Sequence, residues 1–482
     1  MGISVDRKME QQPTNPKFEG TDLNLSLTTG TGVSKKDAKP SDPQPKMKLT
    51  AEEQEIYDGK HGEIKQKAMK TIVSYGEWFG AEKLVDLTGP VHMALSWGSG
   101  AIAPLLEIYE EIIDAGIKTY KPFSANPMPM DHENLAPAPE KREEFDATYT
   151  NQERLIEDLV KLGLIDRDSF SCSSYLPEAG NTPKKGDYLA WTESSAINYS
   201  NSVIGSRTNR NSVGMDMLCN ILGKAPFFGL MTDEGRKAKW LIDVRTKKRP
   251  RSMVLGSAIG LKVLEDIPYI IGVDKFLDEL PEEQKLAWLK DMGATTASNG
   301  AVGLYHVEGA TPEAIEKGRD LLVDDYQTYV IDDEELDRIY NSYPNLWPEG
   351  AKPEQVFVGC PHFTVEQLRL SAVKLEEGLK EAGIDKPVLP VYLFAGKKVA
   401  DAFATRYPKE AKFFEDVGVK IAHNCPVMYM QTPVISDEPI ITSSNKCRVY
   451  SIARFFYDKN LMHIVTTGEL PKEYQTEEEK YE

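Results

Sequence analysis

Two stretches of the sequence decide the fold class: Val356-Phe357-Val358-Gly359-Cys360-Pro361 and Val419-Lys420-Ile421-Ala422-His423-Asn424-Cys425-Pro426. Each begins with a short apolar run and ends in a Cys-Pro pair, which is typical of a buried strand that runs into a turn. Ligand sites in open α/β sheets lie beyond the carboxyl ends of the strands. We therefore expect the two thiols to face the same crevice.

The segments around these stretches repeat the same alternation. From about residue 296, apolar runs at 302–307, 356–358, 388–394 and 419–422 alternate with helical segments. This pattern predicts an α/β domain with a mostly parallel sheet over residues 296–468. Residues 49–295 open with the capping box Thr50-Ala51-Glu52-Glu53 and predict a more mixed α/β region.

The two ends of the chain differ from this pattern. Residues 1–48 contain one aromatic residue, Phe18, and five prolines, so we interpret them as a flexible extension. Residues 469–482 are interpreted as an acidic tail.

The composition excludes several classes of protein. The chain has 57 Lys and Arg against 75 Asp and Glu, and its net charge of −18 argues against nucleic acid as the main partner. A small anion held by a local pair of arginines stays compatible with that charge. The five cysteines are too few for a disulfide scaffold, and neither a secretory signal nor a membrane-spanning run is found. We therefore expect a cytoplasmic protein without membrane contact.

The cysteines have two interpretations. A third cysteine, Cys172, lies in a polar loop far upstream of Cys360 and Cys425, so no short metal-binding motif is formed. Each cysteine taken singly is more often a core residue. Three thiols on loops or at strand ends of one chain make an iron–sulfur site a serious alternative. Cys219 and Cys447 are expected to be structural.

Further candidate residues lie in two polar segments. Arg207 and Arg210 have the i, i+3 spacing of a helix, and two guanidinium groups so placed suit a carboxylate or phosphate. Solvated arginines on a surface helix are the alternative. His306 ends an apolar strand, where a hydrogen-bonded structural histidine is more common than a catalytic one. The basic run 245–251 is interpreted as a solvated turn or a subunit-docking patch.

An ordered set of motifs resembles the aconitase X family over about residues 47–455. The motifs are Cys172-Ser173-Ser174-Tyr175, Glu193-Ser194-Ser195-Ala196, Asn201-Ser202-Val203-Ile204-Gly205, Arg207-Thr208-Asn209-Arg210, His306-Val307-Glu308-Gly309-Ala310-Thr311-Pro312-Glu313, Gly359-Cys360-Pro361-His362 and Thr442-Ser443-Ser444-Asn445-Lys446.

The resemblance implies an aconitase-like fold, with three-layered α/β domains around an iron–sulfur cluster. It implies that the swivelling fourth domain is absent from this chain and is supplied by a separate small subunit. The activity implied is that of a hydro-lyase acting on a small hydroxy carboxylate such as cis-3-hydroxy-L-proline. Mevalonate 5-phosphate is the alternative substrate, and a non-catalytic redox or iron sensor or a metal-free structural subunit is the alternative from another class.

The resemblance also implies roles for single residues. Three cysteines would hold three irons of a 4Fe–4S cluster, with 2Fe–2S as the alternative, and the open iron would act on the substrate hydroxyl. The expected cluster ligands are Cys172, Cys360 and Cys425. The expected substrate-binding residues are Arg207, Asn209, Arg210, Asn126 and His92, with Ser194 and Ser195 orienting the substrate. The base is expected on the small subunit, with His306 and Lys446 as alternatives in this chain.

Overall fold

The computed structural model describes residues 44–94 and 99–471, without the side chains of residues 99–103. The unit Pro45–Glu482 is described below. Of the predicted extension and tail, residues 1–43 and 472–482 lie outside the described residues. No helix in the described ranges is long and apolar enough to cross a membrane.

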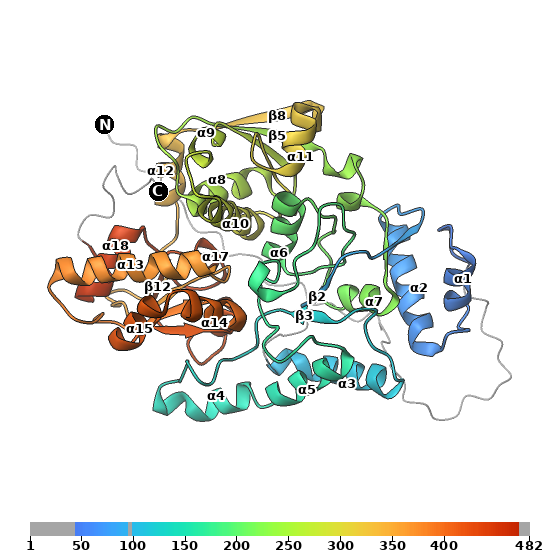
Figure 1. Ribbon diagram of the computed structural model, residues 1–482, viewed down its shortest axis with the longest axis horizontal. Coiled ribbons are helices and arrows are strands. Elements are labelled where there is room, and N and C mark those ends of the chain that lie inside the picture. Colours follow the sequence, from blue (N-terminus) through green and yellow to red (C-terminus); the bar gives the residue numbers. More distant parts are fainter. Residues whose placement is uncertain (1–43, 95–98, 472–482) are drawn as a thin grey trace, which may run out of the picture. The chain divides into compact units, whose positions relative to one another are not determined.

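The predicted parallel sheet is confirmed in the C-terminal part. Its strand order is β11-β10-β9-β12-β13, and every neighbouring pair runs parallel. The strands are β9 (Gln355–Val358), β10 (Val391–Phe394), β11 (Lys420–Ala422), β12 (Ile440–Thr442) and β13 (Arg454–Phe455). The helices are α13 (Val365–Ala382), α14 (Lys397–Arg406), α15 (Pro408–Val417), α16 (Pro426–Met430), α17 (Asn445–Tyr450) and α18 (Asp458–Thr467). Figure 1 shows α13, α14 and α15 in orange around this sheet.

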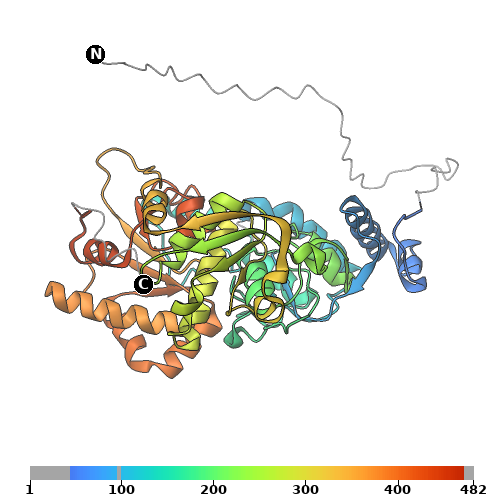
Figure 2. The same cartoon turned by 90° about the horizontal axis from the view of Figure 1, so that it is seen from above.

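A second parallel sheet precedes it, with strand order β7-β6-β5-β8. Its strands are β5 (Ala238–Val244), β6 (Pro268–Ile271), β7 (His306–Val307) and β8 (Leu322–Ile331). Its helices are α8 (Ser252–Val263), α9 (Asp274–Leu277), α10 (Glu282–Asn299), α11 (Pro312–Lys317) and α12 (Asp333–Asn341). Figure 2 shows the long strand β8 in gold along the edge of this sheet.

The apolar run 302–307 forms a shorter strand than its pattern predicts. Only His306–Val307 is a strand, and it joins the sheet of β6. The backbone before it is held by side chains instead. Asn198 donates to the carbonyl of Val302, at 3.0 Å, and the amide of Tyr305 donates to Ser202, at 2.9 Å.

The N-terminal part of the unit is built mainly from helices. They are α1 (Ala51–Tyr57), α2 (Glu63–Trp78), α3 (Ser99–Asp114), α4 (Arg142–Thr148), α5 (Gln152–Leu162), α6 (Ser194–Tyr199) and α7 (Met215–Leu222). Two small sheets pair β1 (Leu84–Asp86) with β4 (Lys224–Pro226) and β2 (Val91–Met93) with β3 (Phe123–Ala125). The predicted capping box opens α1, where Thr50 accepts from the amide of Glu53.

Helices α8 and α10 pack closely because glycines line the contact. A Cβ added at Gly256 would lie 2.4 Å from the carbonyl oxygen of Met292, and one at Gly260 would lie 2.8 Å from that of Thr296. These obstacles are backbone atoms, which cannot rotate away as a side chain can.

We predict that Gly256→Ala destabilises the fold by about 1–3 kcal/mol, because the added methyl group pushes α8 away from α10. Urea unfolding followed by circular dichroism measures the change. The control is Leu261→Ala on the same helix, whose side chain is 48% exposed and whose loss we expect to cost less than about 0.5 kcal/mol. Equal stability of Gly256→Ala and the unmodified chain would contradict the close packing.

Candidate active site

The three predicted cluster cysteines come together from three loops. Cys360 follows β9, Cys425 lies between β11 and α16, and Cys172 lies in the turn after residue 171. Cys172 and Cys360 are buried and Cys425 is partly buried. Burial raises the pKa of the Cys172 and Cys425 thiols, and the nearby Cys360 raises both further. Cys360 is thus within electrostatic range of the other two thiols.

His362 connects the three loops. Its backbone amide donates to Sγ of Cys172 at 3.3 Å, and its Nε2 donates to the carbonyl of Asn424 at 3.0 Å, one residue before the third cysteine. Its Nδ1 therefore accepts from the hydroxyl of Ser171, at 3.2 Å. Burial lowers the pKa of His362 to about 4, so the ring is neutral. The sequence had placed His362 in a motif but had given it no role.

A buried lysine on α10 supports the same loop. Lys290 donates to the carbonyls of His362, at 3.1 Å, and Pro361, at 3.4 Å, and forms an ion pair with Asp291 at 2.8 Å. Its side chain is 1% exposed. The cation therefore fixes the backbone that follows Cys360.

A fourth cysteine lies against the predicted ligands. Cys447 is fully buried, and its thiol lies close enough to that of Cys360 to raise the pKa of the Cys360 thiol. Ser444 holds the two residues together, because its hydroxyl donates to the carbonyl of Cys360 and accepts from the amide of Cys447 at 3.4 Å. The sequence indicated only a structural role for Cys447, since no pattern links it to Cys360.

An ion pair lies beside the cysteines. Nζ of Lys446 lies 2.7 Å from Oε1 of Glu193 and 3.2 Å from Oγ of Ser194. The other carboxylate oxygen accepts from the hydroxyl of Ser195 and the amide of Ala196, both at 2.6 Å. Glu193 is thereby the N-cap of α6. The structure thus brings Ser194, Ser195 and Lys446 together, and it adds Glu193, which the sequence analysis did not single out.

Both members of this pair are charged at neutral pH. Burial alone would raise the pKa of Glu193, but Lys446 lowers it below its ordinary value. Burial alone would lower the pKa of Lys446, but Glu193 and the thiols of Cys360 and Cys172 raise it above its ordinary value. The pKa of each of the three predicted ligand thiols is raised, and the ammonium group acts against that rise. It is therefore the fixed positive charge of the site.

His92 on β2 contacts Asn126, which directly follows the neighbouring strand β3. His92 on β2 lies opposite Ser124 on β3, with Nδ1 at 2.8 Å from that hydroxyl. Nε2 lies 3.2 Å from Oδ1 of Asn126. Burial lowers the pKa of His92 to about 4, against a smaller opposing effect of Glu193. The His92 ring is therefore neutral and lies near the ion pair of Glu193 and Lys446.

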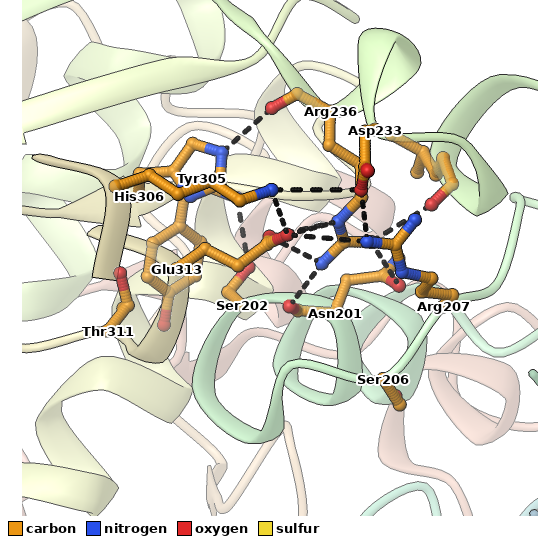
Figure 3. Close-up of polar contacts among 12 residues, drawn as sticks. Asn201, Ser202, Ser206, Arg207, Asp233, Arg236, Tyr305, His306, Thr311 and Glu313 are labelled. Atoms are coloured by element: carbon orange, nitrogen blue, oxygen red, sulfur yellow. Dashed lines mark hydrogen bonds and ion pairs between the residues drawn. The ribbon is translucent and has the colours of Figure 1, made fainter. Parts of the chain in front are cut away.

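The expected helical spacing of the two arginines is wrong. Gly205, with φ of +82°, ends the π-helical turn Ser200–Ile204, and the following residues are not helical. Arg207 points toward Asp233 and forms a hydrogen bond with it (Figure 3). Arg210 instead donates to the carbonyl of Ala301 and lies within electrostatic range of Glu193. The two guanidinium groups have separate surroundings.

Asn209 supports a turn. Its Nδ2 donates to the carbonyl of Phe228 at 3.0 Å, and its Oδ1 accepts from the amide of Leu230 at 2.8 Å. Its amide group is therefore bonded to backbone on both atoms.

His306 lies in a separate buried network around Arg236 (Figure 3). Its Nε2 donates to the carbonyl of Arg236 at 2.9 Å, and burial lowers its pKa to about 4. The Arg236 guanidinium is fully buried and pairs with Glu313 at 2.8 Å and with the carbonyl of Asn201 at 2.9 Å. The charges that act on His306 are those of this network, not those of the cysteine site.

Within 44–94 and 99–471, no group of three or more His, Cys, Asp or Glu side chains is placed to hold a metal ion. The predicted ligand set is nevertheless chemically uniform, since all three donors are thiols. Its immediate surroundings include one ammonium group, which opposes the raised pKa of these thiols.

Comparisons with known proteins agree with this architecture. The family model described as "Aconitase X first domain" matches residues 46–234, and the "Aconitase X second domain" model matches residues 238–341. The crystal structure of holo aconitase X from Thermococcus kodakaraensis superposes with a TM-score of 0.71 at 27% identity, over 88% of this chain and 100% of that one.

The similar proteins fall into two groups by the activity that their names give. The phosphomevalonate dehydratase large subunit of Thermococcus kodakarensis is 32% identical over 73% of this chain and 82% of the relative, and that of Methanosarcina mazei is 30% identical over 84% and 92%. The cis-3-hydroxy-L-proline dehydratase of Hypocrea jecorina is 26% identical over 67% of this chain and 52% of the relative. The chain belongs to the aconitase X family of dehydratases.

Proposed function

We propose that this chain is the large subunit of an iron–sulfur-dependent dehydratase that removes water from a small hydroxy acid. The observation that carries the proposal is the convergence of three cysteine loops on one buried histidine, beside a charged lysine. The name "large subunit" of the phosphomevalonate dehydratase relatives supports a separate small partner subunit.

We assign the cluster to Cys172, Cys360 and Cys425. The donor set fits, because iron–sulfur clusters are held by thiolates and these three thiols lie on separate loops fixed by His362. A cluster spreads its ligands over several irons, so its thiolates lie farther apart than the ligands of one ion. When bound through three cysteines, a 4Fe–4S cluster supplies an iron that acts as a Lewis acid on the substrate hydroxyl.

Within the chain, Lys446 is proposed to hold the negative charge of the substrate. Its raised pKa makes it a permanent cation at neutral pH, so it does not serve as the base. Glu193 fixes the direction of the ammonium group at 2.7 Å, and Ser194 offers its hydroxyl to the same space. Arg210 is a second cation near the pair of Lys446 and Glu193.

The base is proposed to come from the partner subunit. His306 is unsuited to the role, because it is buried in the Arg236 network and its Nε2 donates to a backbone carbonyl. Arg207 is likewise engaged by Asp233, so we do not assign it to the substrate. Asn209 is proposed to support the substrate pocket near Arg210, because its side chain holds the turn at Phe228 and Leu230.

For the substrate, mevalonate 5-phosphate is favoured over cis-3-hydroxy-L-proline. The matches to phosphomevalonate dehydratase large subunits have 27–32% identity and cover 76–95% of those proteins. The matches to cis-3-hydroxy-L-proline dehydratases reach 26–28% identity and cover 44–52%. The hydroxyproline derivative remains the second candidate, since Lys446 and Arg210 also suit a single carboxylate.

The test is turnover by the chain purified without oxygen, reconstituted with iron and sulfide, and combined with the candidate small subunit. We expect loss of one water from mevalonate 5-phosphate, detected by mass spectrometry, and no turnover by the chain alone. The absorption spectrum near 400 nm and electron paramagnetic resonance report the cluster type.

Alanine variants of the three cysteines provide the cluster control. We expect each to lose most of its bound iron, whereas Cys219→Ala, a buried cysteine in another core cluster, keeps it. Iron retention by all three variants would contradict the ligand assignment. Turnover of cis-3-hydroxy-L-proline alone would make it the preferred substrate in place of mevalonate 5-phosphate. Turnover of neither compound would favour the non-catalytic sensor.

We predict that His362→Asn lowers iron retention at least about tenfold, the lower end of the range known for residues that orient metal ligands. The shorter side chain cannot reach Ser171 and Asn424 at once, so the cysteine loops lose their common support. Iron per chain after gel filtration is the measurement.

The matched control is His306→Asn, which removes an equally buried, neutral histidine from the Arg236 network. We expect it to lower thermal stability but to keep its iron and its turnover. An equal loss of iron in both variants would show general destabilisation and contradict the specific role of His362.

We predict that Lys446→Met destabilises the iron-free chain by about 3–5 kcal/mol, because it leaves the carboxylate of Glu193 buried without its cation. The double variant Lys446→Met/Glu193→Gln should recover most of this stability without recovering turnover. Thermal unfolding and turnover are measured in parallel. Turnover in the double variant would rule out the role of Lys446 as the substrate cation.

A further inference from the structure

Asn201 is a fully buried residue whose side chain connects two segments that are distant in sequence. Its Nδ2 donates to the carbonyls of Thr208 and Gly303, both at 2.9 Å. Its Oδ1 accepts from the amide of Thr208 at 3.0 Å. One side-chain amide therefore holds both polar groups of the Thr208 backbone and the carbonyl of Gly303.

Arg236 fixes Asn201 from the other side (Figure 3). Its Nη1 donates to Oδ1 of Asn201 at 3.3 Å, and its Nη2 donates to the backbone carbonyl of Asn201 at 2.9 Å. Glu313 pairs with the same guanidinium at 2.8 Å. Both donors and both lone pairs of the Asn201 amide are thereby used. A buried network with all its polar groups satisfied is rigid, so Asn201 has a defined position.

The two segments that Asn201 holds are the ones that carry and contact Arg210. Arg210 follows Thr208 by two residues, and its guanidinium donates to the carbonyl of Ala301, two residues before Gly303. A Cβ added at Gly303 would lie 3.1 Å from Cγ and 3.2 Å from Cδ of Arg210, so the bare backbone of Gly303 leaves room for this side chain. The backbone, the aliphatic stem and the carbonyl partner of Arg210 all belong to segments that Asn201 fixes.

The position of Arg210 matters because its guanidinium is exposed and lies within electrostatic range of Glu193. The carbonyl of Ala301 carries no net charge, so this contact orients the guanidinium without neutralising it. An arginine side chain that is already oriented loses less conformational freedom when it binds an anion.

We propose that Asn201 is a positioning residue of the substrate site. Through Thr208 and Gly303 it holds Arg210 where the guanidinium meets an anionic group of the substrate. This proposal rests on the proposed function, in which Arg210 is one of two cations near the substrate.

The first experiment measures KM and kcat for mevalonate 5-phosphate with the reconstituted chain combined with its small subunit. The variant is Asn201→Asp, which keeps the size and the acceptor oxygens but cannot donate to the carbonyls of Thr208 and Gly303. We expect KM to rise at least about tenfold, equivalent to one lost hydrogen bond to a charged group. We expect kcat to change little, since the loss of a contact made equally in the ground state and the transition state raises KM alone.

A double-mutant cycle separates positioning from general stability. Arg210→Gln raises KM by itself, and Asn201→Asp added to it is expected to raise KM no further, because both changes act through the same guanidinium. Independent effects of the two changes on KM, or a lower kcat with an unchanged KM, would contradict the proposal.

The matched control is Asn220→Asp. Asn220 is 1% exposed, and its side chain also donates to two backbone carbonyls, those of Ala190 and Asp216. The same isosteric change therefore removes the same kind of contact from other segments. We expect lower thermal stability and an unchanged KM, and an equal rise of KM in both variants would show that Asn201 is only structural.

Gly303→Ala tests the position of Arg210 without changing the buried amide of Asn201. The added methyl group meets side-chain atoms of Arg210 and Leu230, which can shift, so we expect this variant to fold. It should raise KM as Asn201→Asp does. An unchanged KM in the folded variant would overturn the proposal.

A chemical readout distinguishes failure of this proposal from failure of the proposed function. Phenylglyoxal modifies guanidinium groups, and mass spectrometry of the peptide that contains Arg210 gives the rate of its modification in the full chain without substrate. We expect faster modification in Asn201→Asp and Gly303→Ala, whose Arg210 is less firmly held, and an unchanged rate in Asn220→Asp.

The two readouts together decide between the proposals. An unchanged rate of modification in Asn201→Asp would overturn the positioning role, whichever substrate the enzyme takes. Faster modification in a chain that turns over neither candidate substrate would contradict the dehydratase function but support the link between Asn201 and Arg210. Faster modification with an unchanged KM in the active enzyme would show that Arg210 does not bind the substrate, and would overturn the proposal.

Discussion

The neutral imidazole of His362 is the contact on which the cysteine site depends. The ring lies fully buried, and each of its nitrogens has one partner, Ser171 on one side and Asn424 on the other. A buried polar group without a partner is costly, so this pair of hydrogen bonds fixes the distance between two loops that are distant in sequence. The backbone amide adds the sulfur of Cys172, and Lys290 holds the carbonyl. The ring thus sets the relative positions of the thiols.

Two buried ion pairs have different roles in this chain. Arg236 and Glu313 have their remaining polar atoms bonded within the fold, with Asn201 and the carbonyl of Leu230 as further partners of the guanidinium. Such a fully satisfied network stabilises the contact between segments. Lys446, by contrast, meets one carboxylate oxygen and one hydroxyl beside three thiols. The Lys446 ammonium group therefore has fewer partners within the fold than the Arg236 guanidinium, which suits a group that binds an anionic substrate.

The parallel sheet explains why the site lies where it does. β9 and β11 end at the same edge, so Cys360 and Cys425 leave the sheet together, and the predicted crevice follows from strand direction. A cavity of about 550 Å³ is lined by Cys360 and by side chains of β9, β10 and α13, so it borders the same part of the sheet.

The sequence by itself determined the fold class and the family, and it predicted the three thiols, because apolar periodicity, capping boxes and ordered motifs are local properties. It could not determine which polar residues share surroundings. Arg207 and Arg210 are close in sequence, yet Gly205 ends the helical turn and the two guanidinium groups part. Glu193 and Lys446 are 253 residues apart, and only the tertiary structure decided that they meet. The same holds for Cys447, which shares a buried core cluster with Cys360 through long-range packing that no local pattern encodes.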